Sequence, residues 1–158
     1  MSLSIIVAMT KNRVIGKQGR IPWHIKEDME LFRRLTLGST VIMGRNTWES
    51  LPERFRPLPQ RVNIIVSTTL SVQEGAVVCK SVEKALEVAK SHGLDVYCIG
   101  GAQLYRSMLL LADTMHISLI KEDFDGDTYF PEIDFSKWQE AYSEDFPQFI
   151  YKKYKRVI

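Results

Sequence analysis

The chain has 158 residues, a length at which one hydrophobic core is usual, and its 45% hydrophobic and 25% charged residues are typical of a globular protein. We therefore expect a single domain spanning residues 1–158. The formal net charge is only +2, which is too small a surplus to indicate a nucleic-acid or membrane partner. The start of the chain lacks the charged segment of a signal peptide, and no stretch is of transmembrane length, so we expect a cytoplasmic protein.

Two cysteines and three histidines are scattered without metal-ligand spacing, so no metal site is expected. Cys79 and Cys98 are interpreted as small buried hydrophobic residues. No long exposed apolar stripe requires a partner, and we expect a monomer.

Segments typical of strands and of helices alternate along the chain. Strands are expected at residues 3–9, 41–43, 62–66, 76–79, 96–99 and 115–120, several of them rich enough in Ile and Val to be buried on both faces. Helices are expected at residues 25–37, 81–92 and 102–111, with a short one at Trp48. Ser81 and Gly93 are typical end signals for the second of these helices.

The pattern changes after Pro131. Residues 138–146 and 149–157 indicate two antiparallel strands joined at Pro147 and Gln148, and the basic run 152–156 is expected to be a solvated face of the second strand. The sequence therefore predicts an α/β fold with a mostly parallel central sheet, helices on both faces and a C-terminal antiparallel hairpin.

Asp28 lies beside Met29 on the apolar stripe that Met29, Phe32 and Leu35 form on the first helix. An ionised carboxylate buried there needs a cation, a set of donors or a polar ligand. The alternative is that Asp28 begins the helix and accepts hydrogen bonds from backbone donors. The long irregular segment before it, residues 12–23 with two glycines, favours a functional role.

Two junctions between a strand and a helix are candidate phosphate sites. At Gly44 a buried strand ends, and Arg45, Asn46 and Thr47 open a helix whose free N–H groups can bind phosphate, although a capped helix with a solvated Arg explains the pattern equally well. At Gly100-Gly101 the absence of Cβ atoms allows close approach of a ligand, or tight packing of helix on strand. Two such junctions in one small domain suggest a dinucleotide that spans both.

The ordered series of motifs resembles the dihydrofolate reductase family, in its bacterial single-domain form, over essentially the whole chain. These motifs are Arg13-Val14-Ile15-Gly16, Ile21-Pro22-Trp23, Asp28 with Phe32, Val41-Ile42-Met43-Gly44-Arg45, Thr47-Trp48-Glu49-Ser50, Arg56-Pro57-Leu58-Pro59, Arg61, Ile99-Gly100-Gly101, Tyr105 and Gly126-Asp127-Thr128.

The resemblance implies reduction of dihydrofolate to tetrahydrofolate with NADPH, which supplies one-carbon metabolism and thymidylate synthesis, and it implies antifolates as inhibitors. Asp28 and Trp23 would be the catalytic residues, with Asp28 clamping the pterin edge. Arg61 would pair with the α-carboxylate of the substrate's glutamate tail. Residues 16–23 would form a mobile flap backed by the loop around Asp127.

The same resemblance implies two sets of binding residues. Those for the substrate are Ile6, Val7, Ala8, Met29, Phe32, Leu51, Leu58, Arg61, Ile99, Tyr105 and Ser118. Those for the cofactor are Ala8, Ile15, Gly16, Gly44, Arg45, Asn46, Thr47, Ser67, Thr68, Lys80, Ile99, Gly100, Gly101, Ala102, Gln103, Leu104 and Tyr105. Asn46 and Gln103 stand where some relatives have basic residues, so fewer positive charges would meet the phosphates.

Two other functions are compatible with parts of the pattern. A reductase of the same fold that acts on a ribosylated pyrimidine in flavin synthesis would use the same cofactor, but it should lack the set of Trp23, Asp28 and Arg61. A nucleotide-binding module without catalysis needs only the two glycine junctions, and it has no need for a buried acid.

Overall fold

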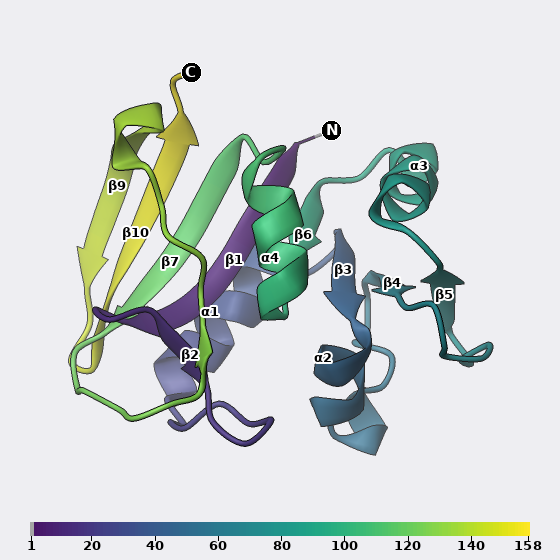
Figure 1. Ribbon diagram of the computed structural model, residues 1–158, viewed down its shortest axis with the longest axis horizontal. Coiled ribbons are helices and arrows are strands. Elements are labelled where there is room, and N and C mark those ends of the chain that lie inside the picture. Colours follow the sequence, from purple (N-terminus) through teal and green to yellow (C-terminus); the bar gives the residue numbers. More distant parts are fainter. Residues whose placement is uncertain (1) are drawn as a thin grey trace.

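The computed structural model describes residues 2–158 and places an eight-stranded sheet at the centre of the molecule (Figure 1). Its strands in chain order are β1 (Leu3–Thr10), β3 (Thr40–Gly44), β4 (Val62–Val66), β5 (Ala76–Cys79), β6 (Val96–Cys98), β7 (Thr114–Ile120), β9 (Trp138–Asp145) and β10 (Phe149–Arg156). Their order across the sheet is β5-β4-β3-β6-β1-β7-β10-β9, and every pair from β5 to β7 is parallel. β10 is antiparallel to β7 and β9, so the predicted C-terminal hairpin is confirmed.

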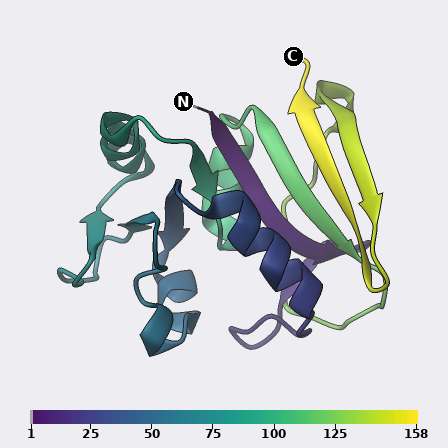
Figure 2. The same cartoon turned by 180° about the vertical axis from the view of Figure 1, so that it is seen from behind.

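Helices cover both faces of this sheet, as predicted. α4 (Ala102–Leu109) crosses the face seen in Figure 1, and α1 (Lys26–Thr36) crosses the opposite face, seen in Figure 2. α3 (Val82–His92) packs against β3, β4 and β5, and the short α2 (Arg45–Ser50) follows β3 directly. Ser81 Oγ accepts a hydrogen bond from the N–H of Lys84, and Gly93 ends α3 with a φ of 67°, so both predicted end signals are confirmed.

Short elements that the sequence analysis did not predict complete the fold. β2 (Val14–Gly16) and β8 (Thr128–Tyr129) form a separate two-stranded sheet, and two 3-10 helices cover Glu53–Phe55 and Phe135–Lys137. Three and two residues are too few to show alternation, so these strands leave no periodic signal.

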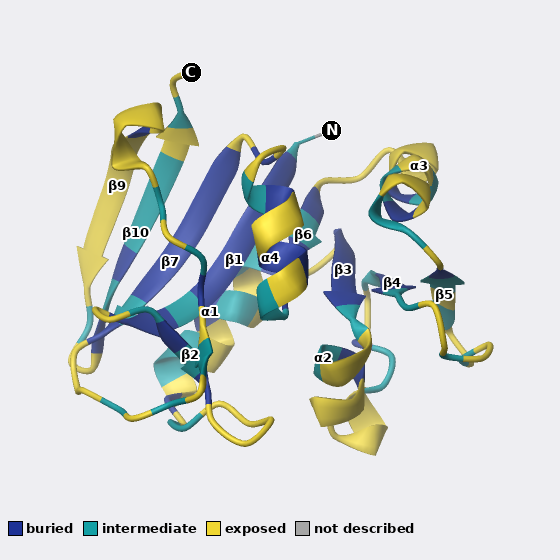
Figure 3. Cartoon of the chain, viewed as in Figure 1, coloured by how far each residue is buried: buried dark blue, intermediate teal, exposed yellow. Residues whose placement is uncertain are grey.

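Residues alternate along the central strands between two apolar layers. Ile42 packs with the residues beneath α3 and α4, whereas its neighbours Val41 and Met43 pack on the opposite face, where they join Phe32 of α1. Burying such a side chain contributes about 1.5–3 kcal/mol, so both faces of the strand stabilise the sheet. Figure 3 shows β1 and β7 dark blue along most of their length, while β9 at the edge is exposed.

The predicted apolar stripe of α1 is wrong in one respect. Leu31 is buried, Phe32 and Leu35 are half-buried, and the side chain of Met29 is 54% exposed. The buried side of the helix centres on Leu31 because that side rests on β7 and β10, and Met29 lies at its margin.

The expectation of a solvated face for residues 152–156 is also wrong. Four of the five are half-buried. Arg156 donates from Nε to the carbonyl of Ala112 at 2.7 Å and from Nη2 to that of Leu109 at 2.5 Å, and its guanidinium lies 4.4 Å from the centre of the Trp138 ring. This arginine therefore connects the last strand to the end of α4.

In residues 2–158 no helix is long and apolar enough to cross a membrane.

Candidate active site

A cavity of about 710 Å³ opens at the carboxyl ends of the parallel strands. It is lined by Ala8 of β1, by Gly44 at the end of β3, by residues 66–69 at and after the end of β4, and by residues 99–105 after β6. Parallel strands end at one edge of a sheet, and in open α/β folds ligands bind in the crevice at that edge. The cavity therefore lies where this topology places a ligand.

The two glycine junctions meet inside the cavity. The N–H of Gly44 donates to the carbonyl of Gly100 at 2.8 Å. A Cβ atom on Gly100 would lie 3.1 Å from the Tyr105 ring, and the φ of this residue is 111°. Neither Gly44 nor Gly101 caps the helix that follows it with a side chain, so free N–H groups at the starts of both helices are available to a ligand.

The charge of the cavity suits an anion. Arg20, Arg45 and Lys80 are among its lining residues, and none of the described lining residues is acidic. Arg45 is held in place by Nη1, which donates to Thr69 Oγ1 at 2.8 Å, and by Nε, which lies 3.2 Å from a Glu49 carboxylate oxygen. Hydroxyl groups of residues 67–69, cations and free N–H groups together fit the phosphates of a dinucleotide.

The structure brings every residue predicted to bind the cofactor to the wall of this one cavity. The prediction missed several lining residues: Gly19, Arg20 and Ile21 of the flap, and Ser50, Val66, Thr69, Val82, Ser107 and Thr128. Thr69 could have been found, because it continues the hydroxyl run of Ser67 and Thr68 just after a strand. Ser107 lies further along the helix that begins after Gly101, and Thr128 belongs to the Gly126-Asp127-Thr128 motif, but neither position by itself indicated contact with a ligand.

Asp28 lies in the first turn of α1, on the side that faces the sheet. Burial raises the pKa of its carboxyl group, and hydrogen bonding to Ser118 on β7 partly opposes this shift. The N-cap residue Ile25 makes no side-chain hydrogen bond. Asp28 is therefore a half-buried acid that faces a strand, and the alternative role of helix capping has no support in the contacts of this turn.

Tyr105 connects Asp28 with the cofactor cavity. Its ring lines that cavity, and its hydroxyl donates to the carbonyl of Ile6 at 2.8 Å. Burial raises the pKa of Tyr105 well above the usual value, and the nearby charges of Cys98 and Asp28 add to the shift. Tyr105 thus lines the dinucleotide cavity and lies within electrostatic range of Asp28.

Apolar residues from four parts of the chain gather around Phe32, which lies one turn after Asp28 on α1. Phe32, Leu51, Leu58 and Ile99 belong to one cluster, in which Leu58 is buried. Asn63 holds Leu58 in place, because its side chain accepts from the N–H of Leu58 at 2.9 Å and donates to the carbonyl at 3.0 Å. Asn63 was missed, since a single polar residue inside an apolar strand gives no indication of its partner.

Arg61 lies at the rim of this apolar group. Its Nε donates to the carbonyl of Pro59 at 2.9 Å, and its Nη1 donates to Thr36 Oγ1 at 3.1 Å. Burial and the nearby charge of Arg33 lower its pKa. No described acidic side chain forms an ion pair with it, so an oriented guanidinium is available to a carboxylate.

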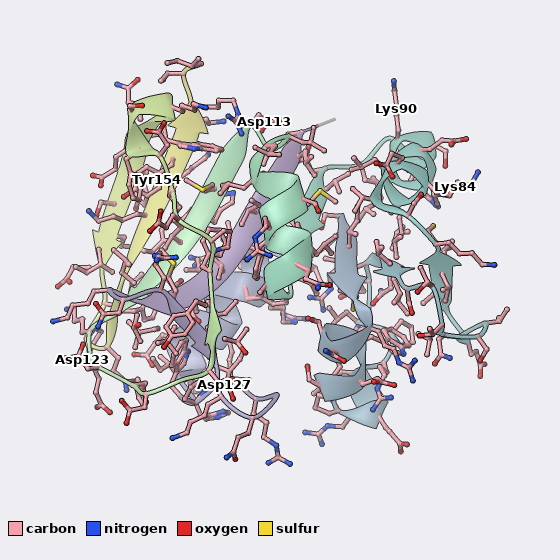
Figure 4. The ribbon with its side chains drawn as sticks, in the orientation of Figure 1. Lys84, Lys90, Asp113, Asp123, Asp127 and Tyr154 are labelled. Carbon is pink, nitrogen blue, oxygen red and sulfur yellow. The ribbon has the colours of Figure 1, made fainter. Side chains whose placement is uncertain are left out.

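The flap, residues 16–23, is tied to the loop between β7 and β8. The carboxylate of Asp127 accepts from the N–H of Gln18 at 2.9 Å, and the N–H of Asp127 donates to the carbonyl of Gly16 at 3.0 Å. Figure 4 shows Asp127 on this loop, just before β8. At the other end of the flap the Trp23 ring lies 5.4 Å from that of Phe124. Both ends of the flap therefore contact one supporting loop.

A cavity suited to a dinucleotide, together with a half-buried acid of raised pKa on α1, defines this protein as a dinucleotide-dependent oxidoreductase. Within residues 2–158 no group of three or more His, Cys, Asp or Glu side chains could hold a metal ion. The described side chains therefore offer an acid, a guanidinium and hydrogen-bond donors as chemical groups.

Comparison with known proteins agrees with this class. A family model described as "Dihydrofolate reductase" matches residues 2–156. The chain is 40% identical to the dihydrofolate reductase of Haemophilus influenzae over 144 residues, covering 91% of this chain and 88% of that protein. It is 40% identical to the Bacillus subtilis protein of the same name over 143 residues, covering 90% and 83%. A solved structure of dihydrofolate reductase from Enterococcus faecalis, complexed with NADP(H) and RAB-propyl, matches with a TM-score of 0.88 at 33% identity and covers 99% of this chain and 97% of that chain.

The chain belongs to the dihydrofolate reductase family. It reduces dihydrofolate to tetrahydrofolate, and its cofactor is NADPH. The choice between dihydrofolate, a ribosylated pyrimidine and a non-catalytic binding module is therefore settled in favour of dihydrofolate.

Proposed function

We propose that Asp28 is the residue of this chain that holds the pterin ring of dihydrofolate and controls its protonation. The observation that carries this proposal is a carboxylate on the sheet-facing side of α1 whose pKa burial raises. A carboxylate accepts hydrogen bonds from an amino group and a ring N–H together, which a pterin edge can donate. With a raised pKa, Asp28 retains a proton at higher pH than an ordinary aspartate does, so it can supply one through an intervening water.

The cofactor would lie in the 710 Å³ cavity. The first turns of α2 and α4 would bind its pyrophosphate through their N–H groups, aided by Arg45 and Thr47. Ser67, Thr68 and Lys80 would face the 2′-phosphate. Ala8, Ile99 and Tyr105 would then orient the nicotinamide against the pterin. When bound, NADPH supplies the hydride.

The substrate would lie between Asp28 and Arg61. Ile6, Val7 and Ala8 pass close to this space on β1, and Ser118 partners the acid. Apolar walls from Met29, Phe32, Leu51, Leu58 and Ile99 would exclude water from the ring and its linker. Arg61 would bind the α-carboxylate of the glutamate tail with two parallel hydrogen bonds. The exposure of Met29 fits this location, because a wall residue is uncovered until its ligand binds.

The flap would close over the reacting rings. Gly16 and Trp23 lie at its two ends and Ile15 precedes it, and its contacts with Asp127 and Phe124 would hold it in the closed position. Closure excludes bulk water, which strengthens the interactions of Asp28 with the pterin. Trp23 would act in catalysis by placing the water that carries the proton.

The remaining proposals concern the molecule as a whole. We infer that it works as a single domain and a monomer in the cytoplasm, because one sheet carries both apolar layers and the strand ends that line the cavity. Antifolate inhibitors would compete with dihydrofolate for the space between Asp28 and Arg61.

The test is an assay of purified protein with NADPH and dihydrofolate, followed by cofactor absorbance. Asp28→Asn should lower kcat by about 100-fold or more, the usual contribution of a general acid or base. Glu30→Gln is the matched control, since Glu30 lies on the same helix but is exposed. An Asp28→Asn variant with the activity of the parent would show that another group protonates the substrate.

A further inference from the structure

A buried polar pair lies on the sheet face beneath α1, outside the site described above. His116 of β7 and Tyr151 of β10 are 5% and 6% exposed, and the Nδ1 atom of the histidine lies 2.7 Å from the tyrosine hydroxyl. Neither residue lines the cofactor cavity. The two rings are nearly parallel, with centroids 6.0 Å apart. A hydrogen bond between residues 35 positions apart in the sequence thus fixes how β10 meets β7 on this face.

The register of the strands connects this pair with the partner of Asp28. Tyr151 lies directly opposite Ser118, and Ser118 in turn lies opposite Ala8 of β1. His116 is two residues from Ser118 on the same strand, so both side chains point to the α1 face. The tyrosine hydroxyl therefore reaches diagonally from the row of Ser118 to the row of His116, a distance that a long aromatic side chain can span.

Tyr151 also forms part of the surface on which the start of α1 rests. It belongs to the buried cluster that contains Ile25, Leu31, Ile120 and Phe149. Ile25 and Leu31 lie three residues before and three residues after Asp28, so all three share one side of the helix. The Tyr151 ring thus supports the part of α1 that carries Asp28.

The polar atoms of the pair depend on each other. Burial lowers the pKa of His116 to about 4, with added effects from Lys153 and Lys155, and burial raises the pKa of Tyr151 to about 12. Both are therefore neutral near pH 7, and each can satisfy the other. Tyr97 of β6, whose ring lies 5.7 Å from that of His116, is the other titratable ring against the histidine. A buried hydroxyl left without its partner costs enough free energy that the ring would move toward water.

We propose that His116 and Tyr151 are positioning residues for Asp28. Their hydrogen bond holds the Tyr151 ring beneath Ile25 and Leu31, and the helix start held in this way keeps Asp28 facing Ser118 of β7. The inference rests on the proposed role of Asp28. It predicts that losing the pair changes the KM for dihydrofolate and the pH dependence of hydride transfer. The affinity for NADPH should not change, since neither residue lines the cofactor cavity.

The experiment compares four variants with the parent. Tyr151→Phe removes one oxygen atom, His116→Leu removes the ring nitrogen atoms, the double variant removes both partners, and His116→Asn restores a polar atom near the position of Nδ1. Tyr142→Phe is the matched control, because Tyr142 is 51% exposed, its ring lies 6.0 Å from that of Tyr151, and its hydroxyl bonds Glu144 instead. For each we would measure the KM for dihydrofolate, the Kd for NADPH, the pH profile of hydride transfer and the Tm.

Tyr151→Phe and His116→Leu should raise the KM for dihydrofolate about three- to tenfold, as a lost hydrogen bond of ordinary strength allows, and leave the Kd for NADPH within about twofold. The inflection of the pH profile should move to higher pH, because the hydrogen bond from Ser118 that lowers the pKa of Asp28 is weakened. The KM of the double variant should be no higher than that of either single variant, since the double variant leaves neither partner of the pair without the other. His116→Asn should recover most of the loss, and Tyr142→Phe should match the parent.

A lower Tm with unchanged KM and unchanged pH profile would overturn the proposal and leave the pair a purely structural role. If His116→Leu fails to fold, Tyr151→Phe decides, because it removes one oxygen atom and keeps the apolar bulk of the ring in the core. A parent that does not reduce dihydrofolate, or an Asp28→Asn variant as active as the parent, would instead refute the proposed function. An active parent, an inactive Asp28→Asn variant and a pair whose loss changes nothing would refute this inference alone.

Discussion

Gly126 offers a direct test of how the supporting loop controls the flap. A Cβ atom at this position would overlap Val14 Cγ1 and would lie 2.6 Å from the carbonyl oxygen of Gly16. The valine side chain can rotate, but the Gly16 carbonyl belongs to β2, which leads into the flap. In Gly126→Ala the loop must therefore retreat, which stretches the 3.0 Å hydrogen bond from the N–H of Asp127 to Gly16 and the 2.9 Å contact of its carboxylate with Gln18.

Overpacking of this kind costs about 1–3 kcal/mol, which corresponds to about a 5- to 150-fold shift of the flap away from its closed position. We expect the rate of hydride transfer in single turnovers to fall at least about fivefold. The Tm should change by only a few degrees, because the strain is relieved in an exposed loop. Asp125→Ala is the control, since Asp125 is an exposed neighbour on the same loop. Hydride transfer at the parent rate in Gly126→Ala would refute the view that the loop holds the flap closed.

Three further predictions concern other parts of the molecule. Arg61→Lys keeps the charge but loses the planar guanidinium, so the KM for dihydrofolate should rise about tenfold while the Kd for NADPH stays within about twofold. An equal rise in both constants would count against a role of Arg61 in substrate binding. Arg156→Met loses two hydrogen bonds to carbonyls and the contact with Trp138. The free energy of unfolding measured in urea should therefore fall by about 2–4 kcal/mol, with kcat unchanged. An unaltered urea midpoint would contradict this prediction. The folded-state pKa of His116, about 4, lies below the ordinary value of 6.5, so the unfolded chain takes up the proton first as the pH falls. Stability that is fully present above pH 6.5 should therefore fall by about 3 kcal/mol toward pH 4, and His116→Asn should lack this component of the pH dependence measured by urea unfolding.

Much of the fold and the cofactor-binding part of the site follow from local patterns in the sequence. Ser81 and Gly93 end a helix by hydrogen bonds and backbone angles that involve only near neighbours, so they are predictable from the sequence. The residues around Gly44 and Gly100 were predicted to meet at one ligand because each marks a junction between a strand and a helix in one small domain. The structure brings them together because the carboxyl ends of parallel strands share an edge of the sheet. Every residue expected to bind the cofactor lies at the cavity formed there.

Contacts between distant segments could not be predicted in this way. The exposure of Met29 depends on which elements cover α1, and the helical period of the sequence alone does not determine this. The placement of Arg156 against the end of α4 and the pairing of β2 with β8 require segments that are far apart in the chain.

The environment of Asp28 shows most clearly what the sequence determines and what the tertiary structure determines. The sequence placed an acid on the inner side of a helix, and its motifs identified the family and the reaction. Only the tertiary structure determined that Ser118 partners the acid and that His116 and Tyr151 lie beneath the helix. The physical reason is that helix periods and end signals arise from interactions over a few residues, whereas burial, pKa and hydrogen-bond partners depend on which distant strands the sheet brings together.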